Sequence, residues 1–248
     1  MRFKTDIKSG GSLFTDLNGH TIQQHKYKDK LKIQGNFFPM PSTAFIQDSE
    51  TRFSVLSSEP HGVASLKEGY LEVVLDRRNQ KDDGRGLGQG LDDNVPTPAR
   101  LRLLVEFGPG AKVEDYVVEY PSLLSYWVQQ SLMHPVFAGH KPGDSSSTRF
   151  VQLMKSLPCD EELVNLRLVD EEADTSLLII RNLGFTCQMD YSQYCQNHKS
   201  KPLKDVFTVP VECKAHPLSP FHEFGDNKVQ NHKPMQFSSY YVHFIGSD

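Results

Sequence analysis

Long hydrophobic runs are missing from this 248-residue chain. Its longest apolar stretches, such as Leu177–Ile180, hold about four or five residues, whereas a helix that crosses a bilayer needs roughly 18 to 20. Met1–Ile7 is charged and lacks the apolar core of a secretory signal. The sequence therefore predicts neither a membrane span nor a signal peptide.

An excess of charge is also missing, because 27 Lys and Arg stand against 31 Asp and Glu, a net charge of −4. Such a chain has no general attraction for phosphate backbones or anionic lipid, so nucleic acid is not an expected partner. With 38% hydrophobic and 23% charged residues, the composition is that of a globular protein rather than a disordered or fibrous one.

Metal and nucleophile patterns are scarce. Four cysteines are too few for a disulfide-built scaffold of this length, and none lies in C-x2-C spacing or a nucleophile signature. The histidines are scattered, without the i, i+4 pair of a metalloprotease helix, and no Gly-x-Ser-x-Gly elbow occurs. The sequence alone predicts no self-contained hydrolase.

Short apolar clusters between turn residues favour β-structure. In Arg100–Leu103 and Asn165–Leu168, leucine alternates with a polar residue, which is typical of a half-buried strand. The one expected helix is Pro121–Met133, where Leu124, Val128 and Leu132 recur every four residues. The expected strands are Ala44–Gln47, Phe53–Leu56, Gly69–Asp76, Arg100–Phe107, Leu163–Val169, Ser176–Asn182, Val206–Val211 and Ser238–Ile245. Many strands with short connections predict a sandwich.

The most unusual segment is Asp76–Asp93, which concentrates glycine and charged residues. It lacks the ending of a P-loop and the glycine spacing of a dinucleotide-binding turn. Calcium binding by Asp82 and Asp83, or by the Asp92–Asn94 run, is an alternative, although the EF-hand order of ligands is absent. Because a plain hairpin tip needs one or two glycines, the alternating glycines favour close approach of the backbone to another surface.

Several blocks follow one another along the chain: Gln34–Pro41, Ala44–Asp48, Leu71–Arg78, Asp82–Gly90, Tyr120–Ser125, Ser156–Asp160, Leu163–Arg167, Gly184–Cys187 and Pro234–Met235. In this order they resemble the C-terminal half of the Golgi α-mannosidases of glycoside hydrolase family 38. The first hundred residues match most closely.

The resemblance implies an all-β fold with little helix, in the form of a large sandwich or supersandwich like that of galactose mutarotase. This region would span residues 1–248, with a subdivision near residues 130–150. It also implies a retaining α-mannosidase of the Golgi lumen that acts in N-glycan processing and mannose metabolism. The nucleophile and the zinc ligands of the family belong to an N-terminal domain, which would also lead to the membrane anchor. We therefore expect this chain to bind no zinc and to be inactive without that domain.

The resemblance gives the Asp82–Gly90 loop a role at the active site of the N-terminal domain, with Arg85 and Gly86 lining the pocket. A guanidinium offers up to five donors to sugar hydroxyls or carboxylates. Pairing of Arg85 with neighbouring acids is the alternative. The expected role of the residues around it is to support the loop: Asp76, Arg77, Arg78, Asp82 and Asp83. For the first three, substrate contact is the alternative.

The resemblance further implies a disulfide between Cys187 and Cys195, with two free thiols as the alternative. Cys159 and Cys213 have no assigned partner. The expected partners are the N-terminal catalytic domain and a mannose-containing N-glycan, with no membrane contact by this region. Two other functions stay open: a stand-alone sugar-binding or interaction module, and a lysosomal-type α-mannosidase, although Gly86–Gly90 resembles the Golgi branch better.

Overall fold

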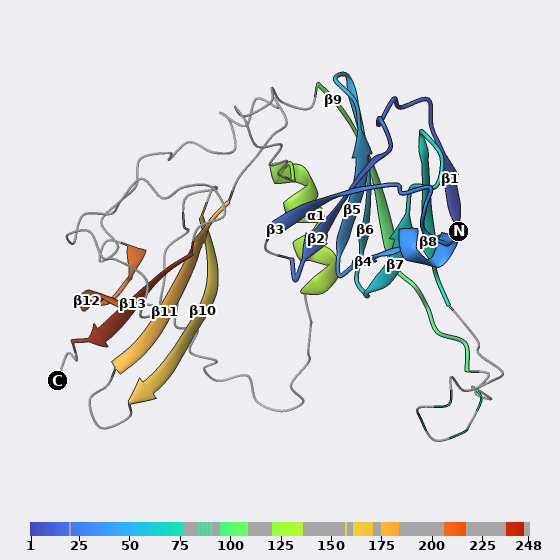
Figure 1. The fold of residues 1–248 in the computed structure, drawn as a ribbon. Helices are drawn as coiled ribbons and strands as arrows, with labels where there is room; N and C mark the ends of the chain where they lie inside the picture. Colours follow the sequence, from blue (N-terminus) through green and yellow to red (C-terminus); the bar gives the residue numbers. More distant parts are fainter. Residues whose placement is uncertain are drawn as a thin grey trace, which may run out of the picture. The chain divides into compact units, whose positions relative to one another are not determined.

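The chain divides into two compact units, each considered by itself. Unit 1 comprises Met1–Phe137 with Thr186–Gln188, and unit 2 comprises Ala138–Phe185 with Met189–Asp248. The computed structural model describes residues 1–19, 21–76, 84, 86, 88, 90, 95–108, 121–135, 157, 161–170, 175–183, 206–216 and 237–245. Antiparallel strands dominate these residues, and α1 is their one α-helix (Figure 1). The predicted all-β sandwich with little helix is confirmed.

Unit 1 contains two antiparallel sheets. The five-stranded sheet has the order β3-β2-β5-β6-β9, and the four-stranded sheet has the order β1-β8-β7-β4. The strands of the first are β2 (Ser12–Leu17), β3 (Thr21–Lys26), β5 (Thr43–Gln47), β6 (Thr51–Ser57) and β9 (Leu101–Phe107). Those of the second are β1 (Arg2–Lys4), β4 (Phe38–Met40), β7 (His61–Ala64) and β8 (Tyr70–Val74). A short 3-10 helix, η1 (Ile33–Asn36), precedes β4.

The two sheets pack on one hydrophobic core. Alternate residues of each strand point inward, so both sheets contribute buried aliphatic and aromatic side chains. The core residues are Ile7, Leu13, Met40, Ala44, Ile46, Phe53, Val55, Val63, Leu71 and Val73. Phe3 of β1 closes one side, with its ring centroid 5.3 Å from that of Phe53.

The helix α1 (Leu123–Met133) contacts β6 and β9 of the five-stranded sheet. It begins where the Ser122 hydroxyl accepts a hydrogen bond from the Ser125 amide at 2.9 Å, a standard N-cap. The predicted helix is therefore confirmed. Its fully buried side chains, however, are Leu123, Ser125 and Gln129, so the leucine and valine stripe read from the sequence is only half-buried.

Unit 2 contains a four-stranded antiparallel sheet of order β10-β11-β13-β12. Its strands are β10 (Glu161–Asp170), β11 (Thr175–Asn182), β12 (Val211–His216) and β13 (Phe237–Phe244). Leu178, Ile180, Phe207 and Val242 form the centre of its hydrophobic cluster. On β11, the buried Arg181 guanidinium pairs with Glu162 of β10 at 2.6 Å.

One strand prediction was wrong. Val206 and Phe207 are buried, but the strand begins only at Val211, so the predicted Val206–Val211 strand is mostly a turn. The apolar residues of this segment correctly indicated that it is buried, but they did not determine its backbone conformation. The sequence analysis also did not identify five short strands of unit 1: β1, β2, β3, β4 and β7.

Candidate functional site

The glycine-rich segment links the two sheets of unit 1. It leaves β8 of the four-stranded sheet after Val74 and enters β9 of the five-stranded sheet at Leu101. Of its predicted site residues, Asp76 and Gly86 are described, and both are exposed. The others lie outside the described residues: Arg77, Arg78, Asp82, Asp83 and Arg85. Their roles stay predictions.

Two glycines of this segment have backbone conformations that explain their identity. Gly84 has φ +80° and Gly88 has φ +72°, the left-handed region that other residues rarely adopt. A Cβ atom placed on either would meet no atom within 4 Å. Both glycines are exposed. The glycines are therefore needed here for backbone conformation and not for lack of space within this chain.

The strand that leads into the segment is held on both sides. On one side, Val73 exchanges hydrogen bonds with Met1, with the Val73 amide donating to the Met1 carbonyl at 2.8 Å. On the other, the His61 ring Nδ1 lies 3.0 Å from the Val74 carbonyl oxygen. Arg2 and Glu72 add an ion pair at 3.0 Å. The loop base is thus fixed to a rigid sheet, as loops that carry functional residues usually are.

The strand that follows the segment carries an unusual surface. On β9, Leu103 and Val105 are each 53% exposed and Phe107 is 78% exposed, whereas Glu106 is only 5% exposed. The alternation read from the sequence is present, but it leaves apolar side chains exposed and a carboxylate buried. The sequence analysis gave none of these four residues a functional role. The feature of the sequence that could have identified them is the alternation of large apolar side chains just before the turn at Gly108.

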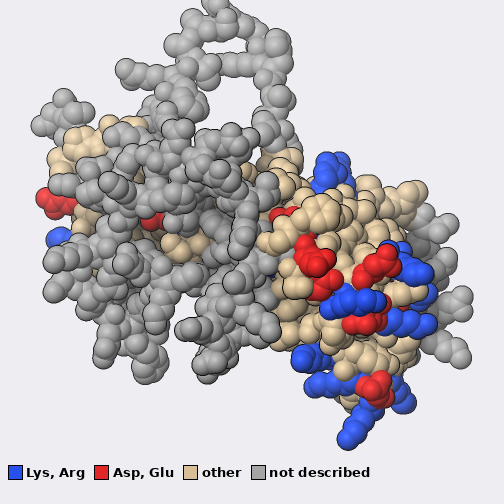
Figure 2. Space-filling model, turned by 90° about the horizontal axis from the view of Figure 1, so that it is seen from above, with Lys and Arg blue, Asp and Glu red and all other residues tan. Residues whose placement is uncertain are grey.

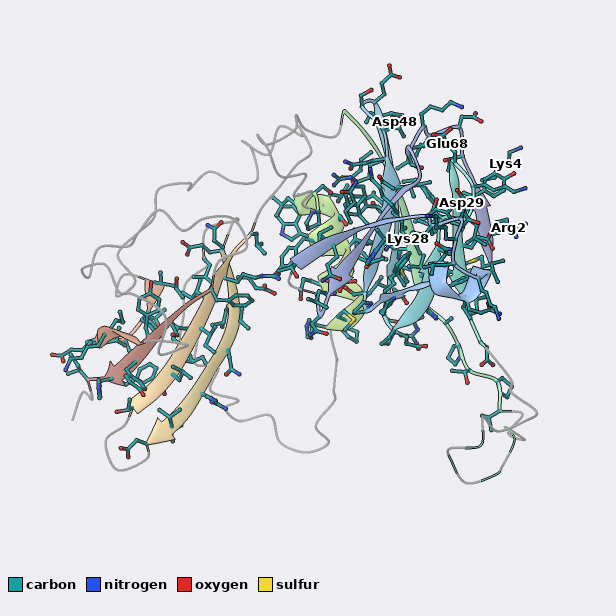
Figure 3. All side chains as sticks on the ribbon, in the orientation of Figure 1. Arg2, Lys4, Lys28, Asp29, Asp48 and Glu68 are labelled. Atoms are coloured by element: carbon teal, nitrogen blue, oxygen red, sulfur yellow. The ribbon has the colours of Figure 1, made fainter. Side chains whose placement is uncertain are left out.

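The charges of unit 1 are mixed in sign. On the face shown in Figure 2, acidic and basic side chains are interspersed. Figure 3 shows Arg2 and Lys4 projecting outward from β1, with Glu68 and Asp48 near the same edge. Among the described residues of this face, neither sign of charge predominates.

Among the described residues of unit 1, Asp48 and His25 have shifted pKa values. Hydrogen bonds from the backbone N–H of Lys8, and also of Glu50 and Thr51, lower the pKa of the Asp48 carboxyl because they stabilise its charged form. Partial burial lowers the pKa of His25, since desolvation disfavours the imidazolium. Both groups fix local structure in this chain.

The described part of the chain contains no group of three or more His, Cys, Asp or Glu side chains that could hold a metal. His25 contacts the Thr15 hydroxyl at 2.8 Å and stacks on Phe38 with ring centroids 4.0 Å apart. The alternative calcium ligands around Asp82 and Asp92 lie outside the described residues. The residues that the structure shows therefore do not fit a zinc site.

The cysteines give little further chemistry. In unit 2, Cys213 is a free thiol, and burial raises its pKa, so it is held in the unreactive protonated form. Cys159, Cys187 and Cys195 lie outside the described residues, and the disulfide stays a prediction. Among the described helices, none is long and apolar enough to span a membrane.

Comparison with known proteins identifies relatives over most of the chain. Residues 1–85 match the family described as glycosyl hydrolases family 38 C-terminal domain. Alpha-mannosidase 2x of Mus musculus is 44% identical over 203 residues, which cover 77% of this chain and 18% of that protein. Alpha-mannosidase 2 of Arabidopsis thaliana is 43% identical over 243 residues, or 88% of this chain and 21% of that protein.

A lysosomal relative is less similar. Lysosomal alpha-mannosidase of Cavia porcellus is 35% identical over 100 residues, which cover 37% of this chain and 10% of that protein. The α-mannosidase 2 type therefore fits better than the lysosomal type. The chain spans about a fifth of the length of the α-mannosidase 2 relatives that it matches.

Proposed function

This chain is a relative of the α-mannosidases of glycosyl hydrolase family 38, and we propose that it is the C-terminal β-sandwich part of such an enzyme. The observation that carries the proposal is identity of 43–44% to α-mannosidase 2 proteins over most of the chain. In this proposal the whole enzyme removes α-linked mannose from N-glycans in the Golgi lumen.

The chemistry of such an enzyme requires groups that the described residues do not supply. Retaining hydrolysis uses two carboxyl groups about 5 to 5.5 Å apart across the scissile bond. We assign neither of them, nor any zinc ligand, to this chain. Both belong to an N-terminal domain of the same polypeptide, which is the partner of this region in our proposal.

The role of this chain is to complete the active site through the glycine-rich segment. Arg85 would offer its guanidinium to sugar hydroxyls or to a carboxylate of the catalytic domain, with Gly86 beside it. The fixed base at β8 and the open space around Gly84 and Gly88 support this role, because the segment has room to meet another domain. Asp76, Arg77, Arg78, Asp82 and Asp83 would hold the loop in position.

A chimera tests the proposal. In alpha-mannosidase 2x of Mus musculus, the 203 matched residues would be replaced by the corresponding residues of this chain. Arg85→Ala is expected to lower kcat/KM about 10- to 100-fold, because a hydrogen bond from a charged donor contributes about 1.5–3 kcal/mol. Arg85→Lys should retain part of the activity, since lysine keeps the positive charge but lacks the planar guanidinium that can donate two parallel hydrogen bonds. Arg167→Ala, at an exposed arginine of β10, is the matched control.

The mannosidase activity of the purified 248-residue chain tests whether it depends on an N-terminal catalytic domain, as we propose. We expect no mannosidase turnover by the purified chain, and measurable turnover would contradict the proposal. Calorimetry with mannosyl oligosaccharides addresses the stand-alone sugar-binding module. Heat of binding at millimolar sugar would favour that alternative, and its absence would count against it.

A further inference from the structure

The inference concerns an apolar strip on β9, formed by Leu103, Val105 and Phe107. The strip lies on the same side of the five-stranded sheet as the unit 1 core, because Val105 pairs with Phe53 and Leu103 pairs with Val55. Phe53 and Val55 are 7% and 0% exposed, whereas the strip residues are 53–78% exposed. Leu101 at the start of β9 packs on the core, whereas the later part of the strand extends past it.

The backbone of β9 also has an open edge. The strand stands last in the sheet order, and within the described ranges its one strand neighbour is β6. Unpaired edges with exposed large apolar side chains are a hazard for aggregation unless another segment covers them. An added strand would satisfy the backbone groups, and its apolar side chains on the same face would pair laterally with those of the strip.

The opposite face of β9 already faces a basic residue. Glu106 is 5% exposed, and in the register of β6 and β9 it stands opposite Arg52, which is fully buried. Because a guanidinium lies across from this carboxylate on the neighbouring strand, Glu106 does not require a basic side chain from another segment. The segment that fits β9 is therefore extended and apolar on the core side.

We infer that this segment is a strand from the remainder of the same α-mannosidase polypeptide. The inference rests on the proposed function. The relatives are about five times as long as the region they share with this chain, so most of the enzyme lies outside it. The Asp82–Gly90 loop that we assign to the catalytic domain precedes β9 in the chain, so both contacts with that domain would come from neighbouring parts of the sequence.

A second copy of this chain is the rival occupant. If two β9 strands paired antiparallel about Leu104, Arg102 of each would stand opposite Glu106 of the other. Such a pair would use seven residues from each copy, whereas a stable interface typically uses roughly 20–30 residues on each side. A strand from the rest of the same polypeptide is covalently linked to β9. Its effective concentration is therefore high, and it can bind through a smaller interface.

The test compares one substitution in two settings: the 248-residue chain and the mouse chimera described above. Val105→Lys should leave the melting temperature of the isolated chain within about 2 °C of the unsubstituted chain, because the side chain is half-exposed. In the chimera it should lower the melting temperature by at least about 5 °C and expose β9 to protease. Leu168→Lys, at a 52% exposed leucine on the edge strand β10, is the matched control for both settings.

Three outcomes would overturn the inference. Equal destabilisation in both settings would make Val105 a core residue of this chain, and no effect in either would leave the strip without a partner. Light scattering that shows a dimer of the isolated chain, dissociated by Val105→Lys, would assign the strip to a second copy. A chimera that is inactive but still destabilised by Val105→Lys would contradict the proposed function and leave the interface standing.

Discussion

Asp16 joins two backbone segments of unit 1 through one buried carboxylate. Its oxygens accept hydrogen bonds from the backbone amides of Gly19, Ser42 and Thr43 at 2.6, 2.9 and 2.7 Å, and from the Ser42 hydroxyl at 3.0 Å. Ser42 precedes β5, and Gly19 lies in the turn after β2. The side chain therefore aligns the β2 turn with the start of β5.

Replacement of Asp16 by Ala should lower the free energy of unfolding of unit 1 by about 3 kcal/mol, because several buried donors lose a charged acceptor at once. Asp16→Asn should be nearly as damaging, since its NH2 group would face N–H donors. Urea denaturation measures the effect. Asp29→Ala, at an exposed aspartate, is the control and should change stability by less than about 0.5 kcal/mol.

His25 makes the stability of unit 1 depend on pH. Burial lowers the pKa of His25 below its usual value of 6.5, so the folded state favours the neutral ring that stacks on Phe38. The unfolded chain binds the proton more readily, so the stabilising contribution is full above about pH 7 and is lost as the pH falls through the unfolded and then the folded pKa.

We therefore expect the urea midpoint of unit 1 to fall as the pH is lowered from 7.5 to 5, and to fall less in His25→Gln. The variant removes this titrating group and keeps a polar side chain beside the Thr15 hydroxyl. The quantity to compare is the difference between the two proteins at each pH, because other groups titrate in both. An identical pH dependence in the two proteins would exclude His25 as the cause.

At the scale of elements, the turn before β8 ties β1 to the four-stranded sheet. Gly69 has φ +73°, and its carbonyl accepts hydrogen bonds from the Thr5 amide at 2.8 Å and the Thr5 hydroxyl at 2.9 Å. A Cβ atom on Gly69 would lie 2.4 Å from the Thr5 carbonyl oxygen. Both the conformation and the close approach therefore require glycine at this position.

Gly69→Ala should cost at least about 2 kcal/mol, since a left-handed conformation and a backbone clash add together. Gly10→Ala is a matched control in the same unit, with φ +58° and no atom within 4 Å of the added Cβ. It should cost only about 1 kcal/mol. Thermal melts of the two variants give the comparison, and equal losses would show that the clash relaxes without cost.

At the scale of the whole molecule, each unit has its own hydrophobic cluster. Leu71 is fully buried in the unit 1 core, and Leu178 is fully buried in the unit 2 cluster. A unit with its own core can unfold as its own cooperative transition. Calorimetry of the chain should therefore resolve two transitions.

Leu178→Ala should lower one of the two transitions by about 8 °C or more and leave the other unchanged, because a cavity of this kind costs about 2–5 kcal/mol. Leu71→Ala should have the reciprocal effect. The two variants are the controls for each other. A single transition that shifts in both variants would mean that the chain unfolds as one cooperative body.

The sequence by itself determined the β class, seven of its eight proposed strands, the helix after Pro121 and the family, because alternation, turn glycines and ordered blocks of identity are local properties of a chain. It did not identify short strands such as β1 and β4, which have three residues each and too little pattern to show a period. Which of the alternating side chains are buried, and which stay exposed to solvent, depends on the tertiary structure. Leu101 and Leu103 look alike in the sequence, yet Leu101 packs on the core and Leu103 is 53% exposed, because burial depends on which side chains of other strands lie over each position, and those strands are distant in the sequence.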